Sequence, residues 1–369
     1  MKEIALIIDS LDKSFSEEGI KGGGNKVSRH LVLEWAKNPE INLDVYSSKS
    51  SVNNLDGVRE IINSDWHLYG EGEQFFSQLK ELLNGKNYDA VIFNDIFAEE
   101  RHLILNCNSL PYRYSNCKNF LLSIILKFLK RKKIAVQKRF LQNKNRKFFA
   151  VSNIVKEDYA KNFGIPYENI FTAYPGVEMP MQDYQKKKNS VFTFGIVNSG
   201  GYNKGIYTLI SSLKLLKRTK IPFKLKLIYP KYNNDSFFKF YLKLNRLEDE
   251  VEILEFQKNM TDFYNSIDCL LLPSFSEAFG LVVLEAASFS TPSIVSSTSG
   301  VSEIILDKEN GFLFSMKNNR KKNLFKKMKE VINLKKEKPD EFEKVQKNAH
   351  ETAQKYSWKN FADSIANNL

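Results

Sequence analysis

Apolar runs of strand length alternate with helix-like patterns along the whole chain. Runs that are apolar at nearly every position are typical of strands buried on both faces, as in parallel sheets. Several of these runs are rich in Val, Ile and Phe, which favour strands. The predicted strands are 4–9, 41–47, 89–95 and 147–153 in the first half, and 191–197, 223–230, 251–256, 268–274 and 292–297 in the second.

Between these runs, apolar residues recur at the three-to-four-residue spacing of amphipathic helices. Strand and helix in alternation predict parallel sheets covered by helices on both faces. The predicted helices are 26–35, 73–83, 206–216, 237–244, 261–266 and 281–288. A further helical pattern begins at Asp340 and is interrupted by Tyr356, Ser357 and Trp358.

A change of composition divides the chain near its middle. Pro175, Gly176 and Pro180 precede a run of three lysines and the next apolar run. At 369 residues the chain also exceeds the roughly 250–300 residues at which single cores stop growing. We therefore expect an α/β protein with two doubly wound, Rossmann-like domains that face a central cleft. The first would comprise 1–175 with a returning C-terminal helix at 357–369, and the second would comprise 176–356.

The composition is that of a folded globular protein, with 42% hydrophobic and 13% aromatic residues. Asp9 and Asp12 interrupt the short N-terminal apolar run, so we interpret it as a buried strand rather than a signal peptide. Cys107, Cys117 and Cys269 lack the spacing of a zinc or redox site and favour a reducing compartment. No segment approaches the ~18–20 apolar residues of a membrane span. A cytoplasmic protein is expected.

Positive charge is concentrated in one segment. The formal net charge is +12, and residues 117–147 hold eleven Lys or Arg and no Asp or Glu. Apolar residues at helical spacing are followed there by four basic residues, Lys130, Arg131, Lys132 and Lys133. This pattern favours either contact with an acceptor at the anionic inner face of a membrane, or a domain helix with a solvated basic side. No nucleic acid is expected as a partner, because no nucleic-acid motif accompanies the charge.

Two glycine-rich stretches lie between a predicted strand and a predicted helix, where parallel sheets bind ligands. They contain Gly22, Gly23 and Gly24 in the first half, and Asn198, Ser199, Gly200, Gly201 and Lys204 in the second. Glycine lets a ligand approach the backbone closely, and a lysine at a helix N-terminus favours a phosphate. Each stretch alone is equally compatible with an ordinary turn.

A third stretch places two carboxylates around an apolar helix. Glu277 comes just before Phe279, Gly280 and Leu281, where the helix begins, and Glu285 lies one residue from its apolar stripe. Taken singly, Glu277 is also compatible with a charge that complements the helix dipole. Glu285 alone is compatible with a surface residue.

Together and in this order, these residues resemble the signature of the family-4 retaining glycosyltransferases of the GT-B fold. The resemblance covers essentially the whole chain and is strongest from Ser152 to Phe314. It is carried by Glu277, Ala278-Phe279-Gly280, Glu285-Ala286, Pro292, Gly300, Glu303 and Asn310-Gly311, with Gly22–Gly24, Pro175-Gly176-Val177, Lys204-Gly205 and Tyr356-Ser357-Trp358 in agreement.

The resemblance implies roles for these residues. Glu285 would accept hydrogen bonds from the ribose of a nucleotide-sugar, Glu277 would face the donor sugar, and Lys204 would neutralise the departing diphosphate. Glu277 and Lys204 are the implied catalytic residues, and the other implied donor-binding residues are Phe279, Gly280, Leu281, Gly23, Gly24, Asn198, Ser199 and Gly200. No metal or other cofactor is expected, because the family transfers sugars without one.

One departure from the family pattern concerns the phosphates. The family usually carries an arginine shortly before the lysine, and Asn198 and Ser199 occupy that place here. We expect an enzyme that moves a sugar from a nucleotide-sugar to an acceptor, such as a lipid-linked or cell-surface glycan precursor. The alternative is a catalytically silent protein of the same fold that chaperones or scaffolds an active partner.

Overall fold

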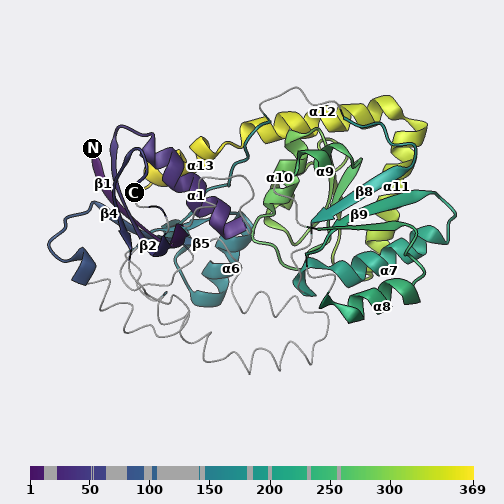
Figure 1. The fold of residues 1–369 in the computed structure, drawn as a ribbon, viewed down its shortest axis with the longest axis horizontal. Helices are drawn as coiled ribbons and strands as arrows, with labels where there is room; N and C mark the ends of the chain where they lie inside the picture. The colour runs from purple at the N-terminus through teal and green to yellow at the C-terminus, as the bar shows by residue number, and fades with distance from the viewer. Residues whose placement is uncertain are drawn as a thin grey trace. The chain divides into compact units, whose positions relative to one another are not determined.

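Two units, each containing one parallel β-sheet, make up the part of the chain that the computed structural model describes (Figure 1). Unit 1 holds Met1–Pro175 and Trp358–Leu369, and unit 2 holds Gly176–Ser357. The described residues are 1–11, 23–50, 52, 54–63, 81–94, 102–105, 141, 146–180, 186–197, 202–230, 234–255 and 259–369.

The described strands of unit 1 form a seven-stranded parallel sheet in the order β3-β2-β1-β4-β5-β6-β7. All residues of β1 from Ile4 to Ile8 are buried, as expected for a strand covered on both faces. The strand order reverses between β1 and β4. The elements are β1 (Lys2–Leu11), α1 (Gly23–Ala36), β2 (Ile41–Ser50), β3 (Val58–Asn63), β4 (Ala90–Asn94), β5 (His102–Leu105), β6 (Phe148–Ala150), α6 (Asn153–Phe163), η2 (Tyr167–Asn169), β7 (Ile170–Thr172) and α13 (Trp358–Ala366).

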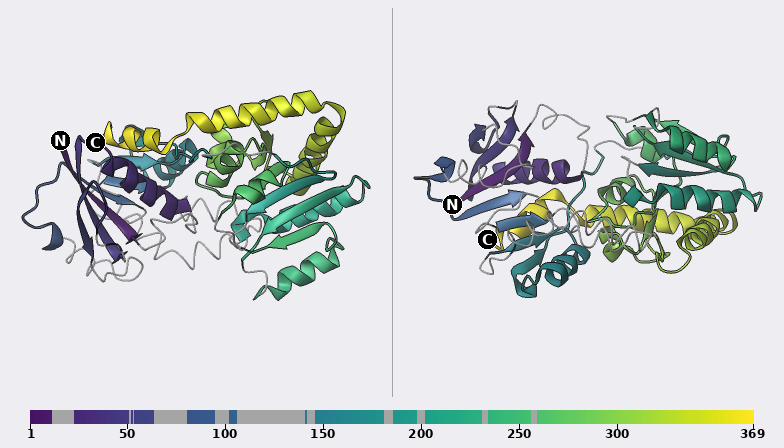
Figure 2. Two further views of the ribbon diagram at one scale, coloured as in Figure 1. Left: turned by 45° about the horizontal axis from the view of Figure 1, so that its top comes forward. Right: turned by 90° about the horizontal axis from the view of Figure 1, so that it is seen from below.

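The C-terminal helix α13 packs on α1 within unit 1 (Figures 1 and 2). The ring of Trp358 stacks on His30 with the two centroids 4.2 Å apart. Trp35 donates a hydrogen bond from Nε1 to the carbonyl of Ala362 at 3.2 Å, and Lys2 donates one from Nζ to the carbonyl of Ala366 at 2.7 Å. The last helix of the chain therefore covers the first helix.

His30 makes the stability of unit 1 depend on pH. Burial, with smaller contributions from nearby cations, lowers the pKa of His30 from 6.5 to about 3. The unfolded chain therefore binds a proton at this residue below about pH 6.5 while the folded chain does not, so stability is lost as the pH falls through this window. We expect urea unfolding to show a loss of up to about 1.4 kcal/mol per pH unit from this residue. His30→Phe should keep the stack on Trp358 and remove that part of the pH slope; equal slopes for both proteins would contradict the prediction.

The described strands of unit 2 form a six-stranded parallel sheet in the order β10-β9-β8-β11-β12-β13. The chain fills one side of β8 with β9 and β10 and then returns to place β11 on the other side. The strand order therefore reverses between β8 and β11. The elements are β8 (Phe192–Val197), η3 (Tyr202–Lys204), α7 (Ile206–Lys217), β9 (Phe223–Ile228), α8 (Ser236–Leu244), β10 (Val251–Leu254), α9 (Thr261–Asn265), β11 (Cys269–Leu272), α10 (Leu281–Ser288), β12 (Ser293–Ser296), η5 (Gly300–Ile304), β13 (Phe312–Phe314), α11 (Arg320–Glu337) and α12 (Pro339–Lys355).

Buried aromatic and aliphatic side chains join the helices of unit 2 to its sheet. Phe194, Leu271 and Phe312 of the sheet belong to the same buried cluster as Leu209 of α7 and Leu324 of α11. In addition, α11 packs along α7 and α12 packs along α10. This packing holds α7 and α10, the helices that follow β8 and β11, in fixed positions.

Every apolar run identified from the sequence contains a strand, which confirms the prediction of two parallel sheets. The pattern did not predict the short or charged elements β3, β5, β7, β13, α6 and α11. The predicted helix 73–83 lies mostly outside the described residues, and the predicted basic helix with Lys130 to Lys133 lies wholly outside them. Among the helices that the structure describes, none is long and apolar enough to cross a lipid bilayer.

Candidate functional site

The loops that follow β8 and β11 meet at the carboxyl ends of these two neighbouring strands. After β8, the turn η3 leads through Gly205 into α7, and after β11 residues 273–280 lead into α10. The backbone N–H of Phe275 donates a hydrogen bond to the carbonyl of Asn203 at 2.7 Å, which ties the two loops together. In doubly wound sheets, ligands bind beyond the carboxyl ends of the strands where the strand order reverses. The two loops occupy that position in unit 2.

Lys204 and Glu277 form an ion pair between these loops. The Nζ of Lys204 lies 2.6 Å from Oε2 of Glu277, and the same oxygen accepts a hydrogen bond from the Ser274 hydroxyl at 3.2 Å. The lysine side chain is 33% exposed and the glutamate side chain 17% exposed. The structure thus brings together, at an accessible point, the two residues that the sequence indicated as catalytic.

Gly205 allows the two loops to approach each other. Its φ is +71°, in the left-handed region, and a Cβ at this position would lie 2.0 Å from the carbonyl oxygen of Pro273. A side chain here would therefore collide with backbone and would also strain its own conformation. The position of Lys204 next to Glu277 depends on this glycine.

Gly280 begins α10 with a left-handed φ of +113°, and a Cβ there would lie 2.8 Å from Cδ2 of Leu272. The preceding loop is fixed to η5, because Val301 N donates to the carbonyl of Phe279 at 2.8 Å and Gly300 N donates to that of Glu277 at 3.0 Å. No acidic side chain lies in the first turn of α10. The partial positive charge of this helix N-terminus is therefore not neutralised by the helix itself and favours an anion or a polar oxygen.

Glu285 is held by a buried tyrosine. The hydroxyl of Tyr264, on α9, donates a hydrogen bond to Oε2 of Glu285 at 2.6 Å. Burial, together with the nearby Glu285, raises the pKa of Tyr264 well above its ordinary value, so the hydroxyl keeps its proton. A carboxylate can accept several hydrogen bonds at once, which suits it to binding hydroxyl groups. The sequence indicated Glu285 but not Tyr264, which lies in the short predicted helix 261–266 and belongs to no motif.

A lysine joins the ends of α9 and α10. The Nζ of Lys186 donates hydrogen bonds to the carbonyls of Tyr264 at 3.3 Å and Phe289 at 3.4 Å, and it also contacts the hydroxyl of Thr291. Burial lowers the pKa of Lys186 from 10.5 to about 7, although the negative charge of Asp268 acts to raise it. The sequence indicated only a basic run at this point. In the structure, Lys186 helps to position the helix that carries Glu285.

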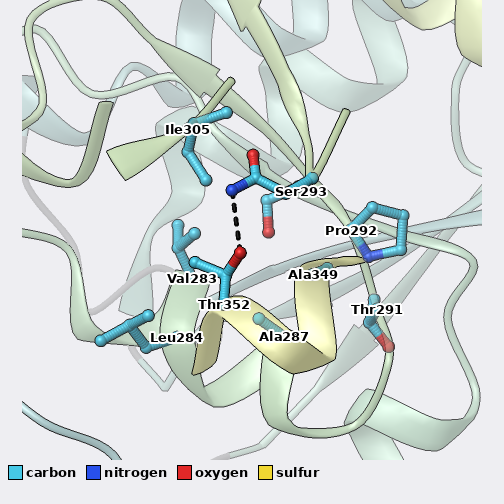
Figure 3. Close-up of a pocket in the computed structure, with 10 residues that line it drawn as sticks. Val283, Leu284, Ala287, Thr291, Pro292, Ser293, Ile305, Ala349 and Thr352 are labelled. Atoms are coloured by element: carbon cyan, nitrogen blue, oxygen red, sulfur yellow. Dashed lines mark hydrogen bonds between the residues drawn. The ribbon is translucent and has the colours of Figure 1, made fainter. Parts of the chain in front are cut away.

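A small cavity behind α10 is separate from this site. It lies between α10 and α12 and has a volume of about 10 Å³. Figure 3 shows Val283, Leu284 and Ile305 around it, with Thr352 accepting a hydrogen bond from Asn310 at 2.9 Å. A cavity of this size holds about one water molecule. It is a packing feature.

The other predicted site residues do not all fall in this part of the structure. Phe279, Gly280 and Leu281 form the start of α10 beside Glu277. Gly23 and Gly24 lie in the first turn of α1, which follows β1 at the strand-order reversal of unit 1. Outside the described residues lie Asn198, Ser199 and Gly200, as well as Lys130, Arg131, Lys132 and Lys133.

Comparison with known proteins relates the second half of the chain to a family. Residues 181–351 match the family described as "Glycosyl transferases group 1". The chain is similar to the capsular polysaccharide biosynthesis glycosyltransferase CapM of Staphylococcus aureus, with 27% identity over 169 residues. That match covers 44% of this chain and 43% of CapM. The chain therefore spans less than half the length of this curated relative.

Two solved structures resemble the whole chain. WaaG, a glycosyltransferase involved in lipopolysaccharide biosynthesis, matches with a TM-score of 0.75 and 15% identity over 99% of each chain. Anabaena Alr3699/HepE in complex with UDP-glucose matches with a TM-score of 0.70 and 14% identity, over 100% of this chain and 99% of that one. At these identities the likeness concerns the fold. It confirms the predicted GT-B architecture of two parallel sheets flanked by helices.

Proposed function

We propose that the protein is a family-4 retaining glycosyltransferase, which moves a sugar from a nucleotide-sugar to an acceptor without a metal ion. The observation that carries this proposal is the Lys204–Glu277 ion pair of 2.6 Å, at the strand-order reversal of unit 2. It lies within residues 181–351, which match the group 1 glycosyl transferases. The residues at this point have the chemistry that a diphosphate and a sugar require.

Lys204 would bind the diphosphate of the donor. In the structure its Nζ lies 2.6 Å from Oε2 of Glu277. A diphosphate carries more negative charge than one carboxylate, so it would draw the lysine Nζ away from Glu277. The lysine would then stabilise the charge that develops on the diphosphate as it leaves, and the N-terminus of α10 would add to this effect.

Glu277 and Glu285 would bind the donor rather than react with it. Once Lys204 turns to the diphosphate, Glu277 would accept hydrogen bonds from hydroxyls of the sugar. Glu285, held by Tyr264 at 2.6 Å, would accept hydrogen bonds from the ribose. The acceptor would attack on the face from which the diphosphate leaves. Neither carboxylate forms a covalent intermediate, in contrast to the carboxylate pair of retaining hydrolases.

The acceptor class is proposed by analogy with the related proteins. CapM is named for capsular polysaccharide biosynthesis, and WaaG is described as involved in lipopolysaccharide biosynthesis. We propose by analogy that the acceptor is a lipid-linked or cell-surface glycan precursor, present at the cytoplasmic face of a membrane.

A screen of nucleotide-sugars tests this function. Thermal shift identifies the donor, since a ligand at 100 times its Kd stabilises the protein by about 2.7 kcal/mol. The purified protein is then incubated with that donor and with glycan acceptors, with and without EDTA, and the anomeric configuration of the product is read by NMR. We expect the product to retain the anomeric configuration of the donor, and we expect full activity in EDTA. Donor binding without transfer, until a partner protein is added, would instead support a silent scaffold.

Replacing Glu285 with alanine should weaken the binding of nucleotide-sugar and of free nucleotide alike, because both contain the ribose. The loss of a hydrogen bond to a charged group costs about 1.5–3 kcal/mol, which is roughly 10–150-fold in Kd. Isothermal titration calorimetry measures both ligands. Glu343→Ala, which removes an exposed carboxylate on α12, is the control and should bind as the parent does. Unchanged nucleotide affinity in a folded Glu285→Ala protein would remove the ribose assignment.

A further inference from the structure

An exposed apolar face runs along α8 in unit 2. Phe237, Phe240 and Leu244 have 62%, 61% and 60% of their surface exposed, whereas Phe238 and Leu242 of the same helix are buried in the core. The three exposed residues stand at positions i, i+3 and i+7, so they share one face of the helix. The helix therefore has two apolar faces, and unit 2 covers only one of them.

Aromatic contacts hold this exposed face in place. The rings of Phe237 and Tyr241 stack with centroids 6.3 Å apart, and Tyr207 of α7 meets both rings edge-on at 5.8 and 5.3 Å. The hydroxyls of Tyr241 and Ser211 lie within hydrogen-bond distance at 3.0 Å. Figures 1 and 2 show α7 and α8 side by side at one edge of unit 2. These contacts pack the ring of Phe237 against α7.

Two lysines lie along one side of this face. Lys239 and Lys243 of α8 are exposed, one or two helix positions from the apolar residues. Residues 206–246 contain ten basic residues and one acidic residue, namely Lys214, Lys217, Arg218, Lys220, Lys224, Lys226, Lys231, Lys239, Lys243, Arg246 and Asp235.

The acidic residue that precedes α8 is engaged in the fold. Asp235 accepts hydrogen bonds from Phe238 N at 2.8 Å, which caps α8, and from the Tyr229 hydroxyl at 2.6 Å. After the helix come the exposed Glu248 and Asp249, and then Glu250, which pairs with Lys217 at 2.9 Å. Lys239 and Lys243 therefore place positive charge beside the apolar face.

We propose that this face of α8 binds an anionic lipid surface. Phe237, Phe240 and Leu244 would enter the boundary between headgroups and acyl chains, and the flanking lysines would lie at the level of the lipid phosphates. A second copy of the chain fits less well. In a symmetric contact the same lysines of the two copies would lie close together, and their like charges would repel each other. Its residues differ from those of the proposed donor site and from the basic residues around Lys130.

Sedimentation with vesicles tests the proposal. The protein is expected to bind vesicles of equal parts phosphatidylglycerol and phosphatidylcholine at low salt. Binding to pure phosphatidylcholine should be weaker, and binding to anionic vesicles should be lost near 1 M salt, where the Debye length is about 3 Å. The Lys239→Glu/Lys243→Glu protein should partition at least about thirtyfold more weakly, since each lysine contributes about 1 kcal/mol. Phe240→Ser should also reduce binding, by loss of its apolar surface.

Matched controls separate this surface from general effects. Lys344→Glu/Lys347→Glu makes the same change of net charge on exposed positions of α12, and Leu306→Ser removes another exposed apolar residue, which is 58% exposed. Both controls should bind vesicles as the parent does. Nucleotide affinity and thermal unfolding, measured for every variant, should remain unchanged and show that each protein is folded.

Three results would overturn the proposal. The first is a parent protein that does not sediment with anionic vesicles at low salt. The second is binding that the α8 variants retain in full, which would place the membrane contact in another segment, such as that around Lys130. The third is a dimer, seen by sedimentation velocity, that Phe240→Ser dissociates while vesicle binding is unchanged; a second copy would then be the occupant.

Discussion

Lys204→Ala is expected to lower the turnover number of sugar transfer by about 10²–10³-fold. Removing one group that stabilises the developing charge in a transition state has an effect of this size in other enzymes. The affinity for the intact donor should change much less, because the charge on the diphosphate is greatest as it departs. Turnover is measured at saturating donor, and the Kd is measured separately by calorimetry.

The loss should be specific to the lysine that pairs with Glu277. Lys344→Ala removes an exposed lysine of α12 and serves as the control, with turnover expected to match the parent. Glu277→Gln keeps the size of the side chain but removes the charge that holds Lys204 at 2.6 Å. A Lys204→Ala protein that still turns over within twofold of the parent would exclude Lys204 from catalysis.

Gly205→Ala is expected to destabilise unit 2 by roughly 3 kcal/mol or more and to reduce activity with it. A left-handed φ in a residue with a side chain costs about 1–3 kcal/mol. The new Cβ would also lie 2.0 Å from the carbonyl oxygen of Pro273, so the loops after β8 and β11 would have to separate. Thermal unfolding and turnover of the same preparation provide the two measurements.

The chain offers two matched controls for this substitution. Gly164 has a similar φ of +68° with no atom within 4 Å of its Cβ position, so Gly164→Ala should show the cost of the backbone conformation alone. Gly57 has φ +79° and a Cβ position 1.9 Å from the carbonyl oxygen of Ala36, in unit 1. Gly57→Ala should therefore destabilise the protein while the folded fraction keeps its activity. If Gly205→Ala is no more harmful than Gly164→Ala, the close approach of the loops is not essential.

The sequence predicted the strands that lie in longer apolar runs and missed the short or charged ones. Runs such as 191–197 are almost entirely apolar, so their place inside a parallel sheet could be inferred directly. In contrast, β3 contains Arg59 and Glu60, and β13 spans only Phe312–Phe314, so neither has a pattern of its own. The helix α11 is rich in lysine, which hides its apolar stripe. These elements form because the rest of the sheet and its helices offer them a surface to pack on.

The candidate site could be predicted only in part for the same reason. The order of the motifs indicated Lys204, Glu277 and Glu285, but not that the first two would meet. Their contact depends on β8 lying beside β11, a long-range pairing that no local pattern contains. The hydroxyl of Tyr264 reaches Glu285 only because α9 packs near α10. Partners of this kind follow from tertiary structure, whereas the residue that faces a ligand can carry a sequence signature.

Unit 1 is the first part of the chain to be synthesised and the last to be completed. The helix that covers α1 begins at Trp358, after the whole of Gly176–Ser357. At about 5–20 residues per second, the ribosome needs roughly 10–40 s to make that stretch. During this time Trp35 and His30 lack the helix that buries them, whereas unit 2 has all its strands before Trp358 emerges. The second unit in the sequence can therefore be the first to reach its final fold on the ribosome, and a chaperone that protects exposed apolar surface would find it on α1.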